Sequence, residues 1–193
     1  MLGFIESPYD PRDLEYVNEN EINSEELPEE YDCSEYYRLD VLDQGSTSTC
    51  VPHSLKTVFD TLTYDFNIDI YDIYDRRPNS PEDGMTIRDA LKIVKKDIND
   101  PFFQYYRLRS VLQMKYSIVS NGGCIFALPV KSMYIPEFWK GNNDLGGHAI
   151  CCVGYNKEGF ILQNSWGYEF GDQGKCILPY SDIKYLMEAW GVI

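Results

Sequence analysis

The apolar positions that follow residue 49 repeat with the period of an α-helix. Hydroxyl residues at 46–49 stand just ahead of them and are candidate caps, and Pro52 falls in the first turn, where a proline is tolerated. The pattern therefore predicts an amphipathic helix that begins at Thr49 or Cys50. The residues on its apolar face are Val51, Leu55, Val58, Phe59 and Leu62.

Two further helices are expected before residue 124. One covers about 86–97, where Thr86 and Asp89 resemble a capping box ahead of an apolar stripe. The other covers about 110–120 and ends at Asn121-Gly122-Gly123, because glycine readily adopts the backbone conformation that ends a helix.

After Gly123 the pattern changes to short runs of β-branched and aromatic residues. Residues 156–159 are a candidate hairpin connection between two of these runs. Helices followed by an antiparallel sheet indicate the α+β class, with two halves packed face to face and a site in the cleft between them. The expected strands are Cys124–Val130, 148–155, 160–164 and 175–178.

The length of 193 residues suits one domain with a sizeable core. Within it we expect an N-terminal extension over residues 1–43, a mainly helical part over about 44–120 and a mainly β part over about 121–193. The extension is rich in acidic residues and proline, which is typical of an extended, solvated segment.

Charge narrows the choice of partners. Seventeen Lys and Arg residues against 31 Asp and Glu residues give a net charge of −14. Such a chain repels phosphate backbones and anionic lipid surfaces, so we expect no nucleic-acid partner and no membrane partner. No apolar run approaches the roughly 20 residues of a membrane-spanning helix. A basic substrate or partner would be attracted.

The six cysteines are too few for a disulfide scaffold, and none of them forms a C-x-x-C pair. The first residues also lack the basic and apolar regions of a secretory signal. We therefore expect reduced, mostly buried thiols in an intracellular compartment, which includes a virion or the cytoplasm of a host cell. A zinc site at Cys151-Cys152 with His148 is disfavoured, because neighbouring strand residues point to opposite faces.

Few residues could carry nucleophilic chemistry. Cys50 stands at the start of the first helix, where the helix dipole favours a thiolate. His148 follows two glycines at the start of an apolar strand, and Asn164 comes 16 residues later, where its side-chain oxygen could orient the imidazole. His53, the other histidine, lies on the same helix as Cys50 and would not face it across a cleft, so we interpret it as structural.

Gln44 and Trp166 complete the candidate set. The Gln44 amide, six residues before Cys50, could join the Cys50 backbone N–H in stabilising an oxyanion. Trp166 could shield the contact between histidine and asparagine from water. Taken singly, each residue has an ordinary structural explanation, such as an inert buried thiol or a loop amide. Their combination favours acyl transfer through a cysteine.

The motifs together resemble the papain-like cysteine peptidases, in the short branch found in bacteria and large DNA viruses. The resemblance implies a two-lobed fold, with a helical lobe, an antiparallel β-rich lobe and the active site between them. It implies a peptide or protein substrate bound in extended form, and neither a cofactor nor a metal. The segments that carry it are Gln44-Gly45, Cys50, Gly147-His148-Ala149, Asn164-Ser165-Trp166-Gly167 and residues 7–13, 26–28 and 83–91.

The same resemblance assigns catalytic roles. Cys50 would be the nucleophile, and His148 would be the general base and then the general acid. Asn164 would orient the His148 ring, Gln44 would donate into the oxyanion hole, and Trp166 would cover the His148–Asn164 contact.

It also implies how a substrate and the N-terminal extension would lie. The Gly84 backbone would pair with the extended substrate, and Met85, Gly146 and Ala149 would line a pocket for an apolar P2 side chain. Residues 1–43 would either contact the cleft as a blocking segment or hold the two lobes together, and we favour the second arrangement.

Two alternatives remain open at this stage. The fold could serve as a catalytically idle binding or structural module, for example in a virion. The cysteine chemistry could also be retained for another reaction. The acyl group could pass to an acceptor other than water, as in a thiol acyltransferase, or the bond cleaved could be an isopeptide bond, as in an isopeptidase.

Overall fold

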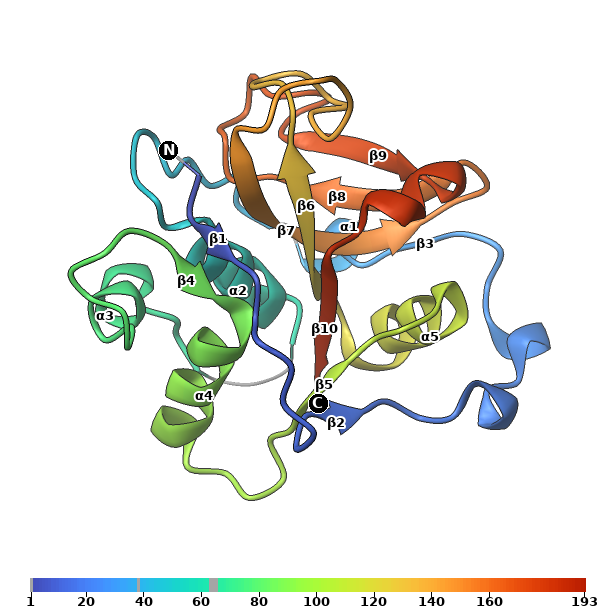
Figure 1. Cartoon of the computed structure of the whole chain (residues 1–193). Coiled ribbons are helices and arrows are strands. Elements are labelled where there is room, and N and C mark those ends of the chain that lie inside the picture. The colour runs from blue at the N-terminus through green and yellow to red at the C-terminus, as the bar shows by residue number, and fades with distance from the viewer. Residues whose placement is uncertain (1, 38, 63–65) are drawn as a thin grey trace.

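The computed structural model describes residues 2–37, 39–62 and 66–193 (Figure 1). Its α-helices are α1 (Ser34–Tyr37), α2 (Cys50–Asp60), α3 (Ile70–Asp75), α4 (Ile87–Ile98) and α5 (Val111–Asn121), and its 3-10 helices are η1 (Glu19–Glu21), η2 (Ser24–Glu26) and η3 (Tyr180–Tyr185). Its strands are β1 (Phe4–Ile5), β2 (Leu14–Glu15), β3 (Tyr31–Asp32), β4 (Met85–Thr86), β5 (Tyr105–Arg107), β6 (Cys124–Val130), β7 (Gly146–Tyr155), β8 (Gly159–Gln163), β9 (Lys175–Pro179) and β10 (Glu188–Val192).

The three predicted helices are confirmed as α2, α4 and α5. The Thr86 cap expected ahead of α4 is present, since the Thr86 hydroxyl accepts from the Asp89 N–H at 3.0 Å and donates to the Asp89 carboxylate at 2.8 Å. The predicted side-chain cap of α2 is wrong. Thr49 occupies the N-cap position without a capping hydrogen bond, and its hydroxyl lies 2.5 Å from that of Thr47 instead. The helix therefore begins at Cys50 without a side-chain cap.

Ten strands of the described residues form one strongly curled sheet, in the order β2-β5-β10-β6-β7-β1-β4, with β3 and β8 also paired to β7 and β9 paired to β8. The four predicted strands are confirmed as β6 to β9. Each of these strands pairs antiparallel with the next one along the chain. Two pairings are parallel, β1 with β4 and β2 with β5. Both involve strands of the N-terminal extension, which the sequence pattern did not predict.

Strands β6 and β7 separate two apolar cores, because successive side chains of a strand point to opposite faces. On one face, Ala149 and Cys151 of β7 join α2, α3 and α4 in the first core. On the other face, Ile150 and Cys152 pack with α5 and with the aromatic residues that follow β6 in the second core. Residue 148 therefore faces the second core, while its neighbour Ala149 faces α2.

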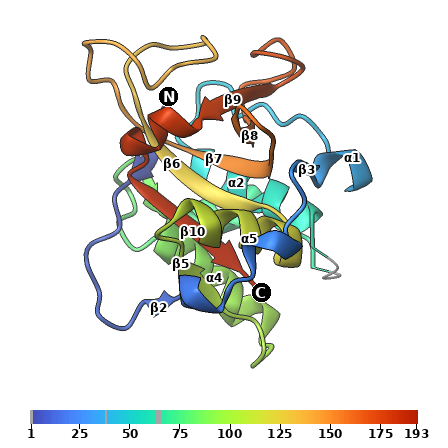
Figure 2. The same ribbon diagram turned by 90° about the vertical axis from the view of Figure 1, so that its right-hand side faces the viewer.

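The N-terminal extension lies along the molecule and crosses both lobes (Figures 1 and 2). Residues 4–5 pair with both β4 and β7, residues 14–15 pair with β5, and residues 31–32 pair with β7. Figure 2 shows the blue segment that carries β2 and the first 3-10 helices running beside α5 and β10 before it reaches β3. Within the described residues, no helix has the length and apolar character needed to cross a bilayer.

Candidate active site

Cys50 is the first residue of α2, and its side chain is fully buried. The backbone groups of Ala149 on β7 and of Gly3 in the N-terminal extension lie near enough to its thiol to lower the pKa of that group. Burial raises the pKa of the Cys50 thiol, and nearby backbone groups, those of Ala149 and Gly3 first among them, lower it by less. The buried thiol therefore lies beside β7 and near Gly3, in surroundings that favour its protonated form.

His148 lies on β7 with its Nε2 2.8 Å from Oδ1 of Asn164. The same oxygen accepts the backbone N–H of Ser165 at 2.8 Å, which fixes the carboxamide with its oxygen toward the ring. Because an amide oxygen only accepts, Nε2 carries the proton and Nδ1 is the unprotonated nitrogen of the neutral ring. Nδ1 is buried and has no hydrogen-bond partner among the described residues.

Two aromatic rings enclose the imidazole. The Trp166 ring lies 4.6 Å from the His148 ring at 31°, and the Phe138 ring meets it edge-on at 5.6 Å and 82°. Burial lowers the pKa of His148 to about 4, and the hydrogen bond to Asn164 opposes that shift. Phe138 was not predicted from the sequence, because nothing in its local pattern links it to His148.

Gln44 is buried, and the loop around it fixes its carboxamide. Its Nε2 donates to the Thr47 carbonyl at 2.8 Å, and its Oε1 accepts from the Ser165 hydroxyl at 2.8 Å. Its backbone N–H also donates to the Ser165 carbonyl at 2.9 Å. Ser165 thus contacts the amides of both Gln44 and Asn164, a link that sequence analysis missed although Ser165 lies within the Asn-Ser-Trp-Gly motif.

The backbone N–H and carbonyl of Gly84 are both hydrogen-bonded to side chains of α3 and of the segment that follows it. Its N–H donates to the Tyr74 hydroxyl at 2.9 Å, and its carbonyl accepts from the Asn79 side chain at 3.0 Å. The N–H of Met85, the next residue, donates instead to the Gly3 carbonyl at 2.7 Å. The backbone pairing with an extended segment that the resemblance implied for Gly84 therefore occurs one residue further on, at Met85.

The three residues suggested for a P2 pocket do not surround a single side chain. Met85 and Ala149 are fully buried in the same apolar core as Phe4, and Phe4 pairs with Met85 in register. Gly146 lies next to this group, against Leu2, since a Cβ built on it would stand 3.5 Å from the Leu2 side chain. The structure thus brings Met85 and Ala149 together and places Gly146 against a different residue.

The remaining candidate groups have structural environments. His53 is buried, and its Nδ1 lies 2.8 Å from the Thr49 carbonyl one turn earlier, so it is engaged within its own helix. The expectation that the other cysteines are buried free thiols is confirmed for Cys33, Cys124, Cys151, Cys152 and Cys176.

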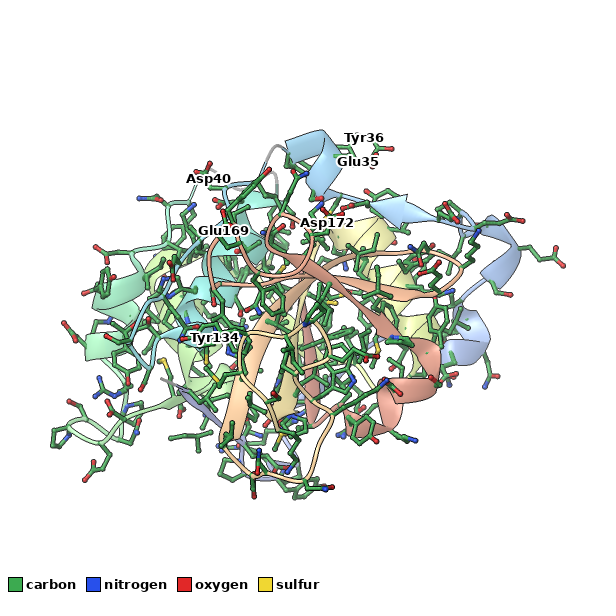
Figure 3. The ribbon with its side chains drawn as sticks, turned by 90° about the horizontal axis from the view of Figure 1, so that it is seen from above. Glu35, Tyr36, Asp40, Tyr134, Glu169 and Asp172 are labelled. Carbon is green, nitrogen blue, oxygen red and sulfur yellow. The ribbon has the colours of Figure 1, made fainter. Side chains whose placement is uncertain are left out.

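Exposed acidic side chains gather on the face that Figure 3 shows from above. They flank the loops that carry Gln44 and Trp166, and these loops are joined by a bridge between Asp43 and Trp166. The labelled acidic residues are Glu35, Asp40, Glu169 and Asp172.

No family model matches the sequence. Solved structures do match the fold. Xylellain, a cysteine protease from Xylella fastidiosa, aligns with a TM-score of 0.79 and 21% identity over 99% of this chain and 95% of that one. The chain has the papain-like fold. A procathepsin B of Trypanosoma congolense aligns with a TM-score of 0.75 and 14% identity over 98% of this chain and 85% of that one. The α+β papain-like architecture expected from the sequence is thereby confirmed.

Two further relatives extend this comparison. A Carica candamarcensis cysteine protease, solved in complex with E-64, aligns with a TM-score of 0.66 and 15% identity over 86% of this chain and 98% of that one. An uncharacterised peptidase C1-like protein of Acanthamoeba polyphaga mimivirus is 46% identical over 47 residues, which are 23% of this chain. Those residues span 14% of the viral protein, so the sequence likeness is local.

Proposed function

We propose that this chain is a cysteine peptidase that hydrolyses peptide bonds through a thioester on Cys50. The observation that carries the proposal is the 2.8 Å contact between His148 and Asn164, on the strand whose next residue, Ala149, touches the Cys50 thiol. This contact leaves Nδ1 of His148 as the basic nitrogen. Papain-like solved structures described as cysteine proteases support the same assignment.

In the first half of the reaction, Nδ1 of His148 takes the Cys50 proton and the sulfur attacks the substrate carbonyl carbon. The resulting tetrahedral intermediate carries a negative oxygen. Two donors suit that oxygen, the backbone N–H of Cys50 at the uncapped start of α2 and Nε2 of Gln44. When the C–N bond breaks, the imidazolium gives its proton to the leaving amine, and a thioester remains on Cys50.

In the second half, water attacks the thioester carbonyl while His148 accepts a proton from that water. The C–S bond then breaks, the sulfur regains its proton from His148, and the acid product leaves. Asn164 keeps the ring in one tautomer through both halves, because its oxygen is held by the Ser165 N–H.

The substrate would bind as an extended chain. Met85 already pairs its N–H with the carbonyl of an extended segment, which is the contact that strand addition requires. The acidic face beside the Gln44 and Trp166 loops would favour substrates with basic residues.

An epoxysuccinyl probe tests this function when its adduct is mapped by mass spectrometry. It should be applied to the full chain and to a variant without residues 1–5, since the thiol is buried and the Gly3 backbone lies near it. We expect labelling at Cys50, none in Cys50→Ala and strongly slowed labelling in His148→Ala. His53→Ala, which removes the other histidine, is the matched control and should label normally. Labelling at another cysteine, or labelling that does not depend on His148, would contradict the proposal.

A further inference from the structure

The chain between β6 and β7, residues 131–145, leads directly into the strand that carries His148, and we call it the β6–β7 loop. It extends beyond the end of β6 and contains no helix or strand (Figure 1). Within residues 131–145, only Phe138 and Trp139 are buried, and both are fully buried. These two rings are therefore the anchors of a loop that is otherwise at the surface.

Phe138 brings the loop into contact with the candidate catalytic residues. Its ring lies 5.6 Å from the His148 ring at 82°, and 5.2 Å from the Trp166 ring at 59°. Aromatic rings at these separations are in contact. The Nδ1 atom of His148 is buried and has no hydrogen-bond partner among the described residues. Phe138 therefore helps to keep water away from the nitrogen that acts as the base.

Trp139 attaches the loop to a different part of the β-rich lobe. Its Nε1 donates to Oδ2 of Asp182 at 3.0 Å, in a buried hydrogen bond. Asp182 lies on η3, the 3-10 helix that follows β9. The Trp139 ring meets the Phe138 ring edge-on at 5.1 Å and 77°. Asp182 thus fixes Trp139, and Trp139 in turn supports Phe138.

The Asp182 carboxylate is buried, and its partners keep it charged. The Nζ atom of Lys140 lies 2.9 Å from the oxygen that accepts from Trp139. Desolvation would raise the pKa of Asp182, but the hydrogen bonds from Lys140 and Trp139 hold it below its ordinary value. The indole donor of Trp139 therefore meets an ionised acceptor, which makes a stronger hydrogen bond than a neutral one.

The loop backbone is fixed around Phe138 as well. The N–H groups of Lys131 and Ser132 both donate to the Phe138 carbonyl, at 2.7 and 3.1 Å. Tyr134 has a φ of 61°, a left-handed conformation that a bulky residue rarely adopts. Its ring lies 5.5 Å from the Trp166 ring. A conformation of this kind persists where the surrounding contacts determine it, so the loop is held in one arrangement.

These contacts form a chain of support that ends at the imidazole. We propose that Asp182 is a positioning residue for the base of the reaction, because its bond to Trp139 holds Phe138 against the His148 ring. Asp182 acts through the two aromatic residues and does not touch the substrate. This inference rests on the function proposed above and adds the residues that keep its base in place. No local motif indicates Asp182, since its partner Trp139 is far from it in the sequence.

The role has a consequence that can be measured at the imidazole. Burial lowers the pKa of His148 to about 4, the hydrogen bond to Asn164 opposes that shift, and the charge of His53 adds to it. Loss of the anchor would let Phe138 withdraw and water reach Nδ1, so the effect of burial would weaken. Asn164, His53 and the Cys50 thiol are unchanged in variants of the loop. A rise in the pKa of His148 would therefore report on the loop.

NMR titration of isotope-labelled histidine rings in the full chain tests this role without any need for turnover. Asp182→Ala removes the acceptor, and Trp139→Phe removes only the indole donor. Asp182→Asn is the conservative variant, because it keeps an oxygen that can accept the same hydrogen bond. Lys140→Met is the matched control, because it removes a neighbouring charge and leaves the bond between Trp139 and Asp182.

A second set of variants tests whether the anchor acts through the Phe138 ring. Phe138→Ala removes that ring, and Phe160→Ala is its matched control. Phe160 is also fully buried in the second core, but its ring packs edge-on against Phe126 at 5.2 Å. The double variant Asp182→Ala/Phe138→Ala completes the set. The urea midpoint of every variant is recorded, since a merely structural role would lower the midpoint and leave the pKa of His148 unchanged.

We expect Asp182→Ala and Phe138→Ala each to raise the pKa of His148 by about 1 or more, from about 4 toward its ordinary value of 6.5. Trp139→Phe should raise it by about 0.5, because the ring is kept and only one hydrogen bond is lost. The double variant should match Phe138→Ala, since the two changes act along one path. Asp182→Asn, Lys140→Met and Phe160→Ala should keep the pKa near 4.

An unchanged pKa of His148 in Asp182→Ala and Trp139→Phe would overturn the positioning role. If Asp182→Ala fails to fold, Trp139→Phe decides alone, because it removes a single hydrogen bond. An equal rise in Lys140→Met or Phe160→Ala would also overturn it, since the lobe would then have loosened as a whole. A double variant that exceeds Phe138→Ala would overturn the path through Phe138.

The titration separates this inference from the proposed function. It reads the imidazole and requires no reaction at Cys50. The expected rises in the pKa of His148, found together with no labelling of Cys50 by the epoxysuccinyl probe, would support the support chain from Asp182 and contradict the peptidase. Labelling of Cys50 with an unchanged pKa of His148 in the variants would do the reverse.

Discussion

Replacement of Asp13 by Asn should destabilise the whole fold, although the residue belongs to the N-terminal extension. The Asp13 carboxylate accepts from Nε of Arg88 at 2.8 Å and from Nε of Arg107 at 3.2 Å, and its side chain is 9% exposed. In Asp13→Asn the two guanidinium groups stay buried, but the negative charge between them is lost. Breaking a buried ion pair on one side costs about 3–5 kcal/mol of unfolding free energy.

Urea unfolding, followed by tryptophan fluorescence, measures this loss. With an m-value of roughly 2 kcal/mol per molar urea, the midpoint should fall by about 1.5–2.5 M. Asp10→Asn is the matched control in the same segment, because Asp10 pairs with Arg12, whose side chain is 84% exposed and screened by water. If the two variants shifted the midpoint equally, Asp13 would not anchor the extension and the reasoning would be refuted.

Three further results are expected. Ser165→Ala should lower kcat about two- to twelvefold at unchanged KM, because loss of one hydrogen bond of about 0.5–1.5 kcal/mol frees the Gln44 carboxamide. Ser165→Thr should restore most of the lost kcat, and an unchanged kcat in Ser165→Ala would remove Ser165 from this role. NMR titration of the two histidines in the full chain should show that His148 stays neutral until the pH approaches its pKa of about 4. Because the unfolded chain takes up this proton at the ordinary pKa of 6.5, the free energy of unfolding should be highest above pH 6.5 and should fall as the pH drops from 6.5 toward 4. A transition for His148 near pH 6.5 would contradict its burial. For a variant without residues 1–5, added salt should lower kcat/KM for lysine-rich peptides more than for neutral ones, and equal salt effects would exclude steering by the acidic face.

Sequence patterns predicted the elements whose signals are local. The apolar face of α2, the capping residues of α4 and the long strands β6 and β7 each carry their pattern within a dozen residues. The strands of the N-terminal extension are two residues long and carry no periodicity. They exist because distant strands supply their hydrogen bonds, so only the folded chain reveals them.

The candidate site was predictable to a similar degree. Residue type, order and spacing selected Cys50, His148 and Asn164, and the structure joins the last two directly. The spacing could not show that the side chains of Tyr74 on α3 and of Asn79 bond to the Gly84 backbone, while the Met85 N–H bonds to the Gly3 carbonyl. It also could not show that the N-terminal extension pairs with β4, β5 and β7, because these pairings join residues that are far apart in the sequence.

Acid-quench mass spectrometry of the acyl-enzyme tests the central claim most directly. A variant without residues 1–5 is mixed with a peptide ester, quenched within milliseconds to seconds and digested for mapping. The account predicts a mass increase equal to the acyl group on the peptide that contains Cys50, absent in Cys50→Ala and slow to form in His148→Ala. No acyl adduct at any time point while the ester is being cleaved, or an adduct on another residue, would contradict it.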